Sequence, residues 1–477
     1  MTLPEEFEKM VRAYGDTYAA PLLDALATES SVSVRANTLK GAAPLPADGP
    51  VPWCPTGVYL AERPLFAADA AWHQGLYYVQ DASSMVYTTV VADIVARFFN
   101  GEPVRYLDAC AAPGGKTIAA LEALPHDSFV VANELDRRRA NILYENITKY
   151  GAPNVAVTRG DASALGRLHE AFDIIAVDAP CSGEGMMRKE EEAVRQWSPA
   201  LIKSCAATQR EILASLWRAL KPGGVLIYST CTFNRSENED NVAFIAGELG
   251  GESIDLGLDR FNGVLKGFDT TLHSYRFTPG HIRGEGLFIA ALRKPGDAAD
   301  TSEPRTARDK KHGKEQRTPR AAGDFARAHV ANAADYVEID TAERTELVPR
   351  RHQQFVADVV KATGALRAGI PLCTVKGRDT VPCHELAVSA ALVPGSFPEW
   401  EVDYPEAMVY LRGESLADVP ETLPKGTVLL LHNGRPLGFA KNIGRRANNL
   451  YPDAFRLRLD ARVLNEQKPL ITLNPKQ

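Results

Sequence analysis

Between about residues 91 and 295, short apolar runs alternate with longer segments of helical pattern. The apolar runs lie at residues 104–108, 129–133, 155–158, 173–178 and 224–230. Alternation of strand and helix is typical of βαβ units on a parallel sheet. The runs lack a regular polar alternation, which indicates strands buried on both faces. We therefore predict a doubly wound, Rossmann-like α/β domain over residues 91–295.

The flanking segments predict smaller domains. Residues 1–90 combine an amphipathic segment, 5–26, with a strand at SVRANTLK, and we expect a small N-terminal domain for RNA binding or support. Residues 305–320 hold seven Lys or Arg and two acids, so we predict a basic, disordered linker over 296–335, favoured as a solvated tether over an RNA contact. A small intermediate domain follows at 336–404. Residues 405–477 predict a β module in which Asn433-Gly434 marks a hairpin turn.

Charge and cysteine usage narrow the class of protein. The formal net charge of −6 excludes a uniformly basic nucleic-acid coat but leaves local basic patches open. No apolar run approaches the roughly 18 residues of a membrane span, and MTLPEEFEKM lacks the apolar core of a signal peptide. The seven scattered cysteines include no C-x-x-C, so we expect free thiols in the cytoplasm. Cys373, Cys383 and His384 fit no common zinc site, and no metal is expected.

The segment YLDACAAPGGKT, residues 106–117, predicts a cofactor loop. A strand ends at Asp108, small residues follow, and a helix with free N–H groups begins at Lys116. Cys110 stands where a P-loop needs glycine, and the loop is not G-x-G-x-x-G. Glu134, directly after the second strand, is placed to accept the hydroxyl groups of a ribose. Loop and acid together fit either NAD or S-adenosylmethionine, and the lack of G-x-G-x-x-G favours S-adenosylmethionine. Asp161, after the third strand, either faces the adenine or caps a helix.

Two cysteines and an aspartate follow the fourth and fifth predicted strands. Asp178 and Cys181 lie in VDAPCSGEGMMRK, and Cys231 lies in YSTCTFNRSENED. Because adjacent parallel strands end at one edge of the sheet, both thiols should face one cleft. This arrangement predicts covalent chemistry on an electrophilic ring, in which a thiolate adds to carbon 6 of cytosine and carbon 5 then attacks a methyl group. Lys189 or the cofactor's sulfonium would favour the thiolate. The residues themselves do not rank the two thiols.

These motifs match a known family. DACAAPGGKT, NELD, GDA, DAPCSGEGMMRK and STCTFNRSENE resemble the RNA cytosine-5 methyltransferases of the Sun/Fmu type. YYVQDASSM, MMRKEEEAVRQWSP, RFTPGHIRGEGLFIAAL and FAKNIGRRANNLYP look like its RsmF (YebU) branch. That branch acts on a cytosine of 16S ribosomal RNA and carries a PUA-like C-terminal domain. The resemblance covers nearly the whole chain outside the linker, and it implies a Rossmann-like methyltransferase domain followed by a PUA-like, β-rich domain.

The resemblance also implies the roles of individual residues. Cys231 would be the nucleophile, Cys181 would assist release of the methylated product, and Asp178 would lie between the cofactor and the base. Glu134 would bind the ribose hydroxyls, and Asp161 would lie on the adenine side. The methionyl and ribose portions of S-adenosylmethionine would be held by Cys110, Ala111, Ala112, Pro113, Gly114, Gly115 and Lys116.

Basic patches are the candidates for RNA contact, since the chain as a whole is acidic. They are Arg35 with Lys40, Arg188 with Lys189, and Lys441 with Arg445 and Arg446. For each patch a solvated face is an equally good interpretation. The C-terminal patch is favoured because Phe439 and Tyr451 interleave with it, and aromatic rings stack on unpaired bases.

The expected substrate is a flipped or single-stranded cytosine of ribosomal RNA, free or in the small ribosomal subunit. The same reaction on transfer RNA is one alternative. A non-catalytic RNA-binding assembly factor is another, and the intact pair Cys181 and Cys231 argues against it. A monomer is expected, because the catalytic unit of the family needs no partner.

Overall fold

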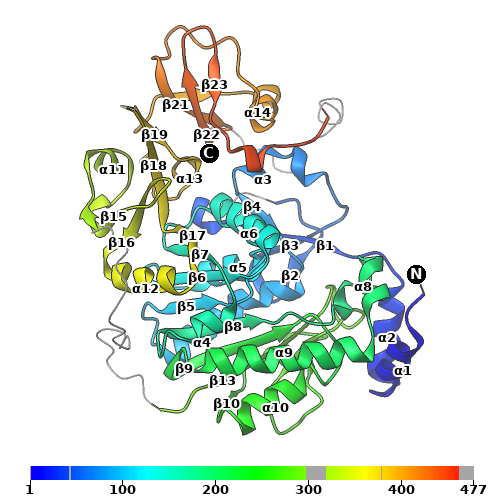
Figure 1. The fold of residues 1–477 in the computed structure, drawn as a ribbon. Helices are drawn as coiled ribbons and strands as arrows, with labels where there is room; N and C mark the ends of the chain where they lie inside the picture. The colour runs from blue at the N-terminus through cyan, green and yellow to red at the C-terminus, as the bar shows by residue number, and fades with distance from the viewer. Residues whose placement is uncertain (1, 42–44, 297–318, 378, 461–477) are drawn as a thin grey trace.

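The computed structural model describes residues 2–41, 45–296, 319–377 and 379–460 (Figure 1). The strands in these ranges form four sheets. None of the helices described is long and apolar enough to cross a membrane.

The largest sheet carries the predicted Rossmann-like domain. Its strands run in the order β11-β12-β13-β9-β8-β5-β6-β7-β17, and β10 pairs with β13. Neighbours from β9 to β7 are parallel, whereas β13 is antiparallel to β9. The parallel strands are β5 (Arg105–Asp108), β6 (Phe129–Glu134), β7 (Val155–Arg159), β8 (Phe172–Asp178) and β9 (Leu220–Thr230). The strands beyond β9 are β10 (Glu252–Ile254), β11 (Leu265–Lys266), β12 (Tyr275–Phe277) and β13 (Leu287–Arg293). The five apolar runs thus form the five predicted strands, and the doubly wound fold is confirmed.

Helices cover both faces of this sheet. One core combines α4 (Val86–Phe98), α5 (Gly115–Ala123) and α6 (Arg137–Tyr150) with side chains such as Val130 and Ala132. The other combines α9 (Pro199–Trp217), α10 (Glu239–Gly247) and α12 (Gln353–Thr363) with Phe129 and Val131. Successive residues of β6 therefore point to opposite cores, as a strand buried on both faces requires. The short helices α7 (Ala162–Leu165) and α8 (Glu191–Gln196) follow β7 and β8.

The N-terminal segment forms a four-stranded sheet of its own, in the order β2-β3-β1-β4. These strands are β1 (Val32–Ala36), β2 (Pro50–Val51), β3 (Cys54–Leu60) and β4 (Tyr77–Val79), and β1 is the strand predicted at SVRANTLK. The amphipathic segment 5–26 forms two helices, α1 (Glu5–Arg12) and α2 (Asp16–Leu26), separated at Gly15. A short helix, α3 (Ala70–His73), precedes β4.

The intermediate unit begins earlier than predicted and extends into the large sheet. Residues 297–318 of the predicted linker lie outside the described part, but the disorder expected up to 335 is wrong from Arg320 on. There β14 (Arg320–Ala321) pairs with β15 (Tyr336–Asp340), and α11 (Asp324–His329) lies between them. The sheet continues with β16 (Thr345–Pro349), β18 (Ile370–Lys376) and β19 (Asp379–Pro382), followed by α13 (His384–Ala387). One strand, β17 (Ala365–Ala368), instead pairs antiparallel with β7.

The C-terminal sheet contains the predicted hairpin. Its order is β20-β21-β22-β23, with β20 (Glu399–Glu401), β21 (Gly426–His432), β22 (Arg435–Asn442) and β23 (Ala447–Asn449). Asn433 and Gly434 join β21 to β22 with φ of 53° and 68°, the left-handed values that a tight hairpin turn requires. Helix α14 (Tyr404–Leu411) packs beside this sheet, which lies at the top of Figure 1.

Candidate active site

The loop between β5 and α5 has the features predicted for a cofactor site. Gly114, the residue before α5, has φ of 112°, a value that other residues rarely adopt. Asp108, at the end of β5, accepts a hydrogen bond of 2.6 Å from the Thr117 hydroxyl, and burial raises the pKa of Asp108 to about 7. The guanidinium of Arg139 donates to the carbonyl of Ala112 at 2.7 Å. These hydrogen bonds fix the start of the loop at Asp108 and its middle at Ala112, with the free N–H groups of α5 beside it.

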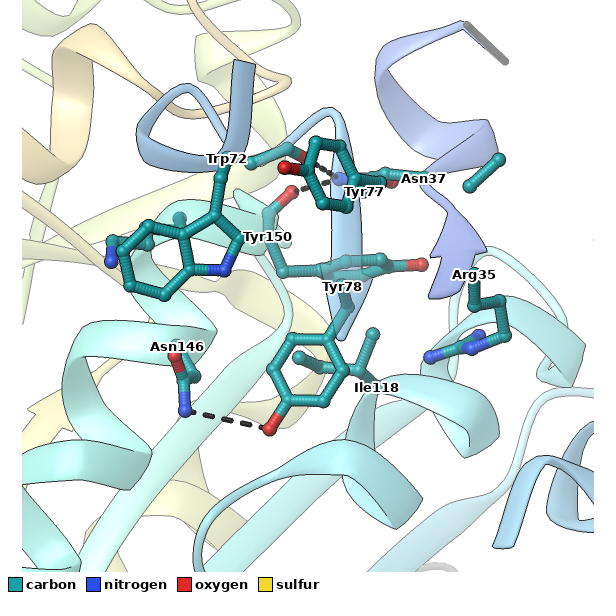
Figure 2. A pocket seen from close by; sticks show the side chains of 11 residues that line it. Arg35, Asn37, Trp72, Tyr77, Tyr78, Ile118, Asn146 and Tyr150 are labelled. Carbon is teal, nitrogen blue, oxygen red and sulfur yellow. Dashed lines mark hydrogen bonds between the residues drawn. The ribbon is translucent and has the colours of Figure 1, made fainter. Parts of the chain in front are cut away.

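A narrow slot lies behind this loop, between the N-terminal sheet and α6. Figure 2 shows Tyr78, Trp72 and Asn146 around it, with the Asn146 amide directed at the Tyr78 hydroxyl. The same Asn146 amide donates to the carbonyl of Pro113 at 2.8 Å. The open space holds little more than one water molecule. A Cβ on Gly115 would lie 3.1 Å from the Tyr78 ring, so a glycine there lets the N-terminal domain pack against the loop.

Glu134 ends β6 and Asp161 follows the neighbouring strand β7, so both lie at the same edge of the sheet. Oε1 of Glu134 accepts from the backbone N–H groups of Leu135 and Asp136 at 2.9 and 3.0 Å. Its buried Oε2 has no hydrogen-bond partner among the residues described, and Arg139 lies 3.5 Å away. A buried carboxylate oxygen that accepts no hydrogen bond from the protein fits the hydroxyl donors of a ribose. Asp161 caps α7 by accepting from Ser163 N at 2.8 Å, which is the capping role that the sequence left open.

The two thiols meet, as the strand order predicted. Cys181 follows β8 and Cys231 follows β9, and their Sγ atoms lie 3.2 Å apart. The hydrogen bond with Cys231, together with burial, raises the pKa of the Cys181 thiol well above its ordinary value. The Cys181 thiol therefore keeps its proton. Gly185 packs against Cys231: its N–H donates to the Cys231 carbonyl at 2.7 Å, and a Cβ there would lie 2.6 Å from that oxygen.

Asp178 and Lys116 form an ion pair beside the thiols. Lys116 Nζ lies 2.7 Å from Asp178 Oδ2, and both side chains are mostly buried. Burial would lower the pKa of Lys116, but the charges of Asp178 and Cys231 outweigh it and raise the pKa. The ammonium group whose charge interacts with Cys231 is thus Lys116, whereas the sequence suggested Lys189. Lys189 lies 3.8 Å from Glu285, at the entrance to the site.

Two buried carboxylates tie the thiol-bearing loops together, and the sequence analysis missed both. Glu184 accepts from the Thr232 hydroxyl at 2.8 Å and from the backbone N–H groups of Phe233 and Asn234 at 2.5 and 3.0 Å. Glu237 accepts from Ser182 N at 3.0 Å. Glutamates in a Gly-rich loop and in a polar segment give little sign of burial. These bonds hold the loop after β8 against the loop after β9.

The predicted RNA contacts divide into buried and exposed residues. Arg35 is 1% exposed, pairs with Glu122 and donates to Gln80, so its assignment to RNA binding is wrong. The assignment of Lys40 to RNA binding is wrong for the same reason. Its Nζ donates to the carbonyls of Gln74 and Lys149 at 2.7 and 2.6 Å, and burial lowers the pKa of Lys40 to about 7. Arg188 forms a buried bidentate pair with Glu285. Lys189 is exposed.

The C-terminal patch keeps its cations but not its aromatic rings. Arg445 and Arg446 are exposed after β22, and Lys441 is 46% exposed and pairs with Asp379 at 3.1 Å. Phe439 and Tyr451 are buried in the core of the module, so their expected stacking on bases is wrong. Within the ranges described, no group of three or more His, Cys, Asp or Glu side chains could hold a metal ion.

Comparison with known proteins agrees with this geometry. Three family profiles match the chain: "16S rRNA methyltransferase RsmB/F" at residues 99–293, "N-terminal domain of 16S rRNA methyltransferase RsmF" at 3–82 and "Methyltransferase RsmF PUA domain" at 397–457. The ribosomal RNA small subunit methyltransferase F of Cronobacter sakazakii is 35% identical over 84% of this chain and 83% of its own length. That of Escherichia coli is 34% identical over 84% of each. The chain belongs to the ribosomal RNA small subunit methyltransferase F family.

A solved structure shares the fold of the methyltransferase region. A methyltransferase homologue from Pyrococcus horikoshii superposes with a TM-score of 0.51 and 26% identity, over 61% of this chain and 95% of that one. The family and the fold identify the protein as a methyltransferase with a PUA domain, and S-adenosylmethionine as its cofactor. The Glu134 oxygen without a hydrogen-bond donor and the free N–H groups of α5 fit that cofactor.

Proposed function

We propose that this protein transfers a methyl group from S-adenosylmethionine to carbon 5 of a cytosine in 16S ribosomal RNA, through a covalent bond from Cys231 to carbon 6. The observation that carries this proposal is the contact between the two thiols, 3.2 Å apart beside Asp178 and Lys116, at the carboxyl edge of a methyltransferase sheet. The ribosomal substrate is supported by the names of the relatives.

The chemistry requires a temporary nucleophile, because carbon 5 of cytosine is itself a poor one. The Cys231 thiolate adds to carbon 6, which moves an electron pair toward carbon 5. Carbon 5 then attacks the methyl group that the cofactor supplies. A water molecule then accepts the proton from carbon 5, and the electron pair of that C–H bond expels the Cys231 thiolate and restores the aromatic ring.

The two thiols are assigned different parts by their surroundings. The Cys181 thiol stays protonated and donates toward Cys231, because its pKa is raised. The Lys116 ammonium interacts with Cys231, and a cation in this place favours attack by the sulfur on carbon 6. Cys181 then lies within reach of the departing sulfur and assists release of the methylated base.

Asp178 is the group that faces both the base and the cofactor. Its carboxylate is already bound by the Lys116 ammonium, and its remaining lone pairs can accept from the amino group or protonated ring nitrogen of the cytosine. Together with the loop 110–116 and Glu134, it positions carbon 5 toward the methyl group. All of these groups come from one chain, so the proposed chemistry needs no residue from a second copy.

An open groove beside the site is suited to a polyanion. It has a volume of about 930 Å³, and its charged lining consists of Arg63, Arg188, Lys189 and Arg283 together with Glu29 and Glu62. Arg188 is paired with Glu285 and Arg283 with Asp48, which leaves Arg63 and Lys189 as the main cations for a phosphate. The groove lies next to the catalytic edge of the sheet through Glu285. The carboxylate of Glu285 lies 3.8 Å from Lys189, and its backbone carbonyl would lie 2.9 Å from a Cβ on Gly185. The exposed pair Arg445 and Arg446 gives a second basic patch, on the C-terminal domain. Cations in these places neutralise phosphates and position the RNA.

The test is to incubate the protein with S-adenosylmethionine and unmodified 16S ribosomal RNA, small ribosomal subunits or transfer RNA, and to measure 5-methylcytosine by nucleoside mass spectrometry. We expect it in ribosomal RNA. Its appearance only in transfer RNA would overturn the substrate, and its absence from all three would overturn the reaction. Cys231→Ala is the matched control for contaminating activity.

A further inference from the structure

Two buried hydroxyl groups form a series of hydrogen bonds that ends on Asp178. Ser229, in β9, donates from Oγ to Asp178 Oδ1 at 2.8 Å. The hydroxyl oxygen of Tyr87, in α4, lies 2.9 Å from Ser229 Oγ. Both side chains are fully buried. Ser229 lies in the motif STCTFNRSENE but was given no role there, Tyr87 lies outside the quoted motifs, and neither belongs to the cofactor loop.

The direction of these hydrogen bonds follows from counting protons. A serine hydroxyl has one proton, and Ser229 gives it to Asp178. The Tyr87 hydroxyl must therefore be the donor to Ser229. Burial raises the pKa of Tyr87 well above its ordinary value, so this hydroxyl keeps its proton. Both hydrogen bonds, from Tyr87 to Ser229 and from Ser229 to Asp178, are therefore donated toward the carboxylate.

Asp178 is thereby held from two sides. Oδ1 accepts from Ser229 at 2.8 Å and Oδ2 accepts from Lys116 at 2.7 Å. One donor lies on β9 and the other on α5, so the plane of the carboxylate is fixed between two elements. A carboxylate with fixed orientation presents its remaining lone pairs in a single direction.

The packing of β9 does not itself call for a serine. Val225 and Ile227 lie on the same face of the strand as Ser229, because side chains of a strand alternate, and both are part of the apolar core. A buried hydroxyl in such a place is unfavourable unless it is hydrogen-bonded. The bond that Ser229 makes is to the carboxylate at the reacting edge, which gives the polar residue a functional reason.

We propose that Ser229 and Tyr87 are positioning residues that orient Asp178 toward the target base. The inference rests on the proposed function, in which Asp178 contacts the cytosine. The two residues act only through Asp178 and touch neither thiol in the arrangement described.

The test compares three variants of the full-length protein in steady-state methylation of 16S ribosomal RNA. Ser229→Ala removes a hydrogen bond to a charged group, and we expect kcat to fall about 10- to 100-fold. Tyr87→Phe leaves Ser229 in place, and we expect a fall of about 3- to 10-fold. The KM and Kd for S-adenosylmethionine should stay within about threefold in both, because the loop 110–116 and Glu134 hold the cofactor.

Tyr106→Phe is the matched control. Tyr106 is fully buried in β5, and its hydroxyl has no hydrogen-bond partner within the part of the chain that the structure describes. Removing the Tyr106 hydroxyl alters a buried tyrosine but none of the hydrogen bonds among Tyr87, Ser229 and Asp178, so kcat should stay within twofold. Thermal unfolding of all three variants separates loss of fold from loss of positioning, and Tyr87→Phe keeps the shape of the core if Ser229→Ala does not fold.

The outcomes separate this inference from the proposed function. If the wild-type protein makes no 5-methylcytosine, the proposed function fails. If the wild type is active and folded Ser229→Ala or Tyr87→Phe keeps kcat within twofold, the positioning role is overturned. It is also overturned if cofactor affinity falls as much as kcat, because the two residues would then support the cofactor site.

Discussion

Glu184→Gln tests whether buried carboxylates hold the two thiol loops together. Five donors converge on the Glu184 carboxylate: Trp197 Nε1 and Asn234 Nδ2 on Oε1, and the Thr232 hydroxyl and the N–H groups of Phe233 and Asn234 on Oε2. A glutamine keeps one acceptor oxygen and turns the other into an NH₂ group. With the NH₂ group in the place of Oε1, Trp197 Nε1 loses its acceptor, whereas Asn234 Nδ2 keeps Glu237. With the NH₂ group in the place of Oε2, the N–H of Phe233 loses its acceptor.

In either placement at least one buried donor is left without a partner, which costs about 1–3 kcal/mol. The free energy of opening the loop after Cys231 should fall by this amount. Hydrogen exchange of the segment 232–238 should then be faster by about 5- to 150-fold, and methyl transfer should slow because Cys231 is no longer fixed.

The assay is hydrogen exchange followed by mass spectrometry, with methylation measured on the same preparations. Glu191→Gln, at an exposed position of the neighbouring helix α8, makes the same chemical change without buried donors and should leave exchange unchanged. Exchange of 232–238 within threefold of wild type in Glu184→Gln would refute the reasoning.

Other variants test separate parts of the account. Cys231→Ala should abolish methylation and leave the affinity for S-adenosylmethionine within a few-fold; retained turnover would transfer the nucleophile to Cys181. Cys181→Ala should slow release, and a protein–RNA band should shift on a denaturing gel; an unshifted band would remove the release role. Folded Asp108, with its pKa raised to about 7 by burial, holds a proton that the unfolded chain releases near pH 4. Its contribution to the free energy of unfolding should therefore fall as pH rises from about 4 to 7, and Asp108→Asn should remove this slope in denaturant titrations of the cofactor-free protein; an unchanged slope would contradict the buried neutral acid. Replacing Arg445 and Arg446 by alanine should lower RNA affinity and reduce the slope of log K against log salt by about 1.4, if each neutralises one phosphate of single-stranded RNA; an unchanged slope would place the RNA elsewhere.

The large sheet could be predicted because its strands are buried on both faces. Runs such as 173–178 and 224–230 are continuous in apolar character, and this pattern leaves few alternatives to a parallel sheet. The same rule placed Cys181 and Cys231 at one edge, since the strands that precede them are neighbours. The hairpin at Asn433-Gly434 could also be predicted, because few residue pairs adopt left-handed φ in succession.

Other features depend on pairings between distant segments. The strand β17 pairs with β7, some 200 residues earlier, and the sequence ALRA has no pattern that reveals this partner. Arg35 and Lys40 were assigned to RNA because a basic residue carries no local sign of burial; the partners that bury them, Glu122 and the carbonyl of Lys149, lie far along the chain. Ser229 had a usable signal, since it is the polar residue in a series with Val225 and Ile227.

The most direct test of the central claim is to identify the cysteine that bonds to the base. RNA in which cytosine carries fluorine at carbon 5 traps the adduct, because the fluorine cannot leave as a cation and the enzyme is not released. After digestion by protease and nuclease, tandem mass spectrometry of the adduct should find the modified nucleotide on Cys231. A nucleotide on Cys181, or efficient methylation of ordinary RNA with no trapped adduct on either cysteine, would contradict the account.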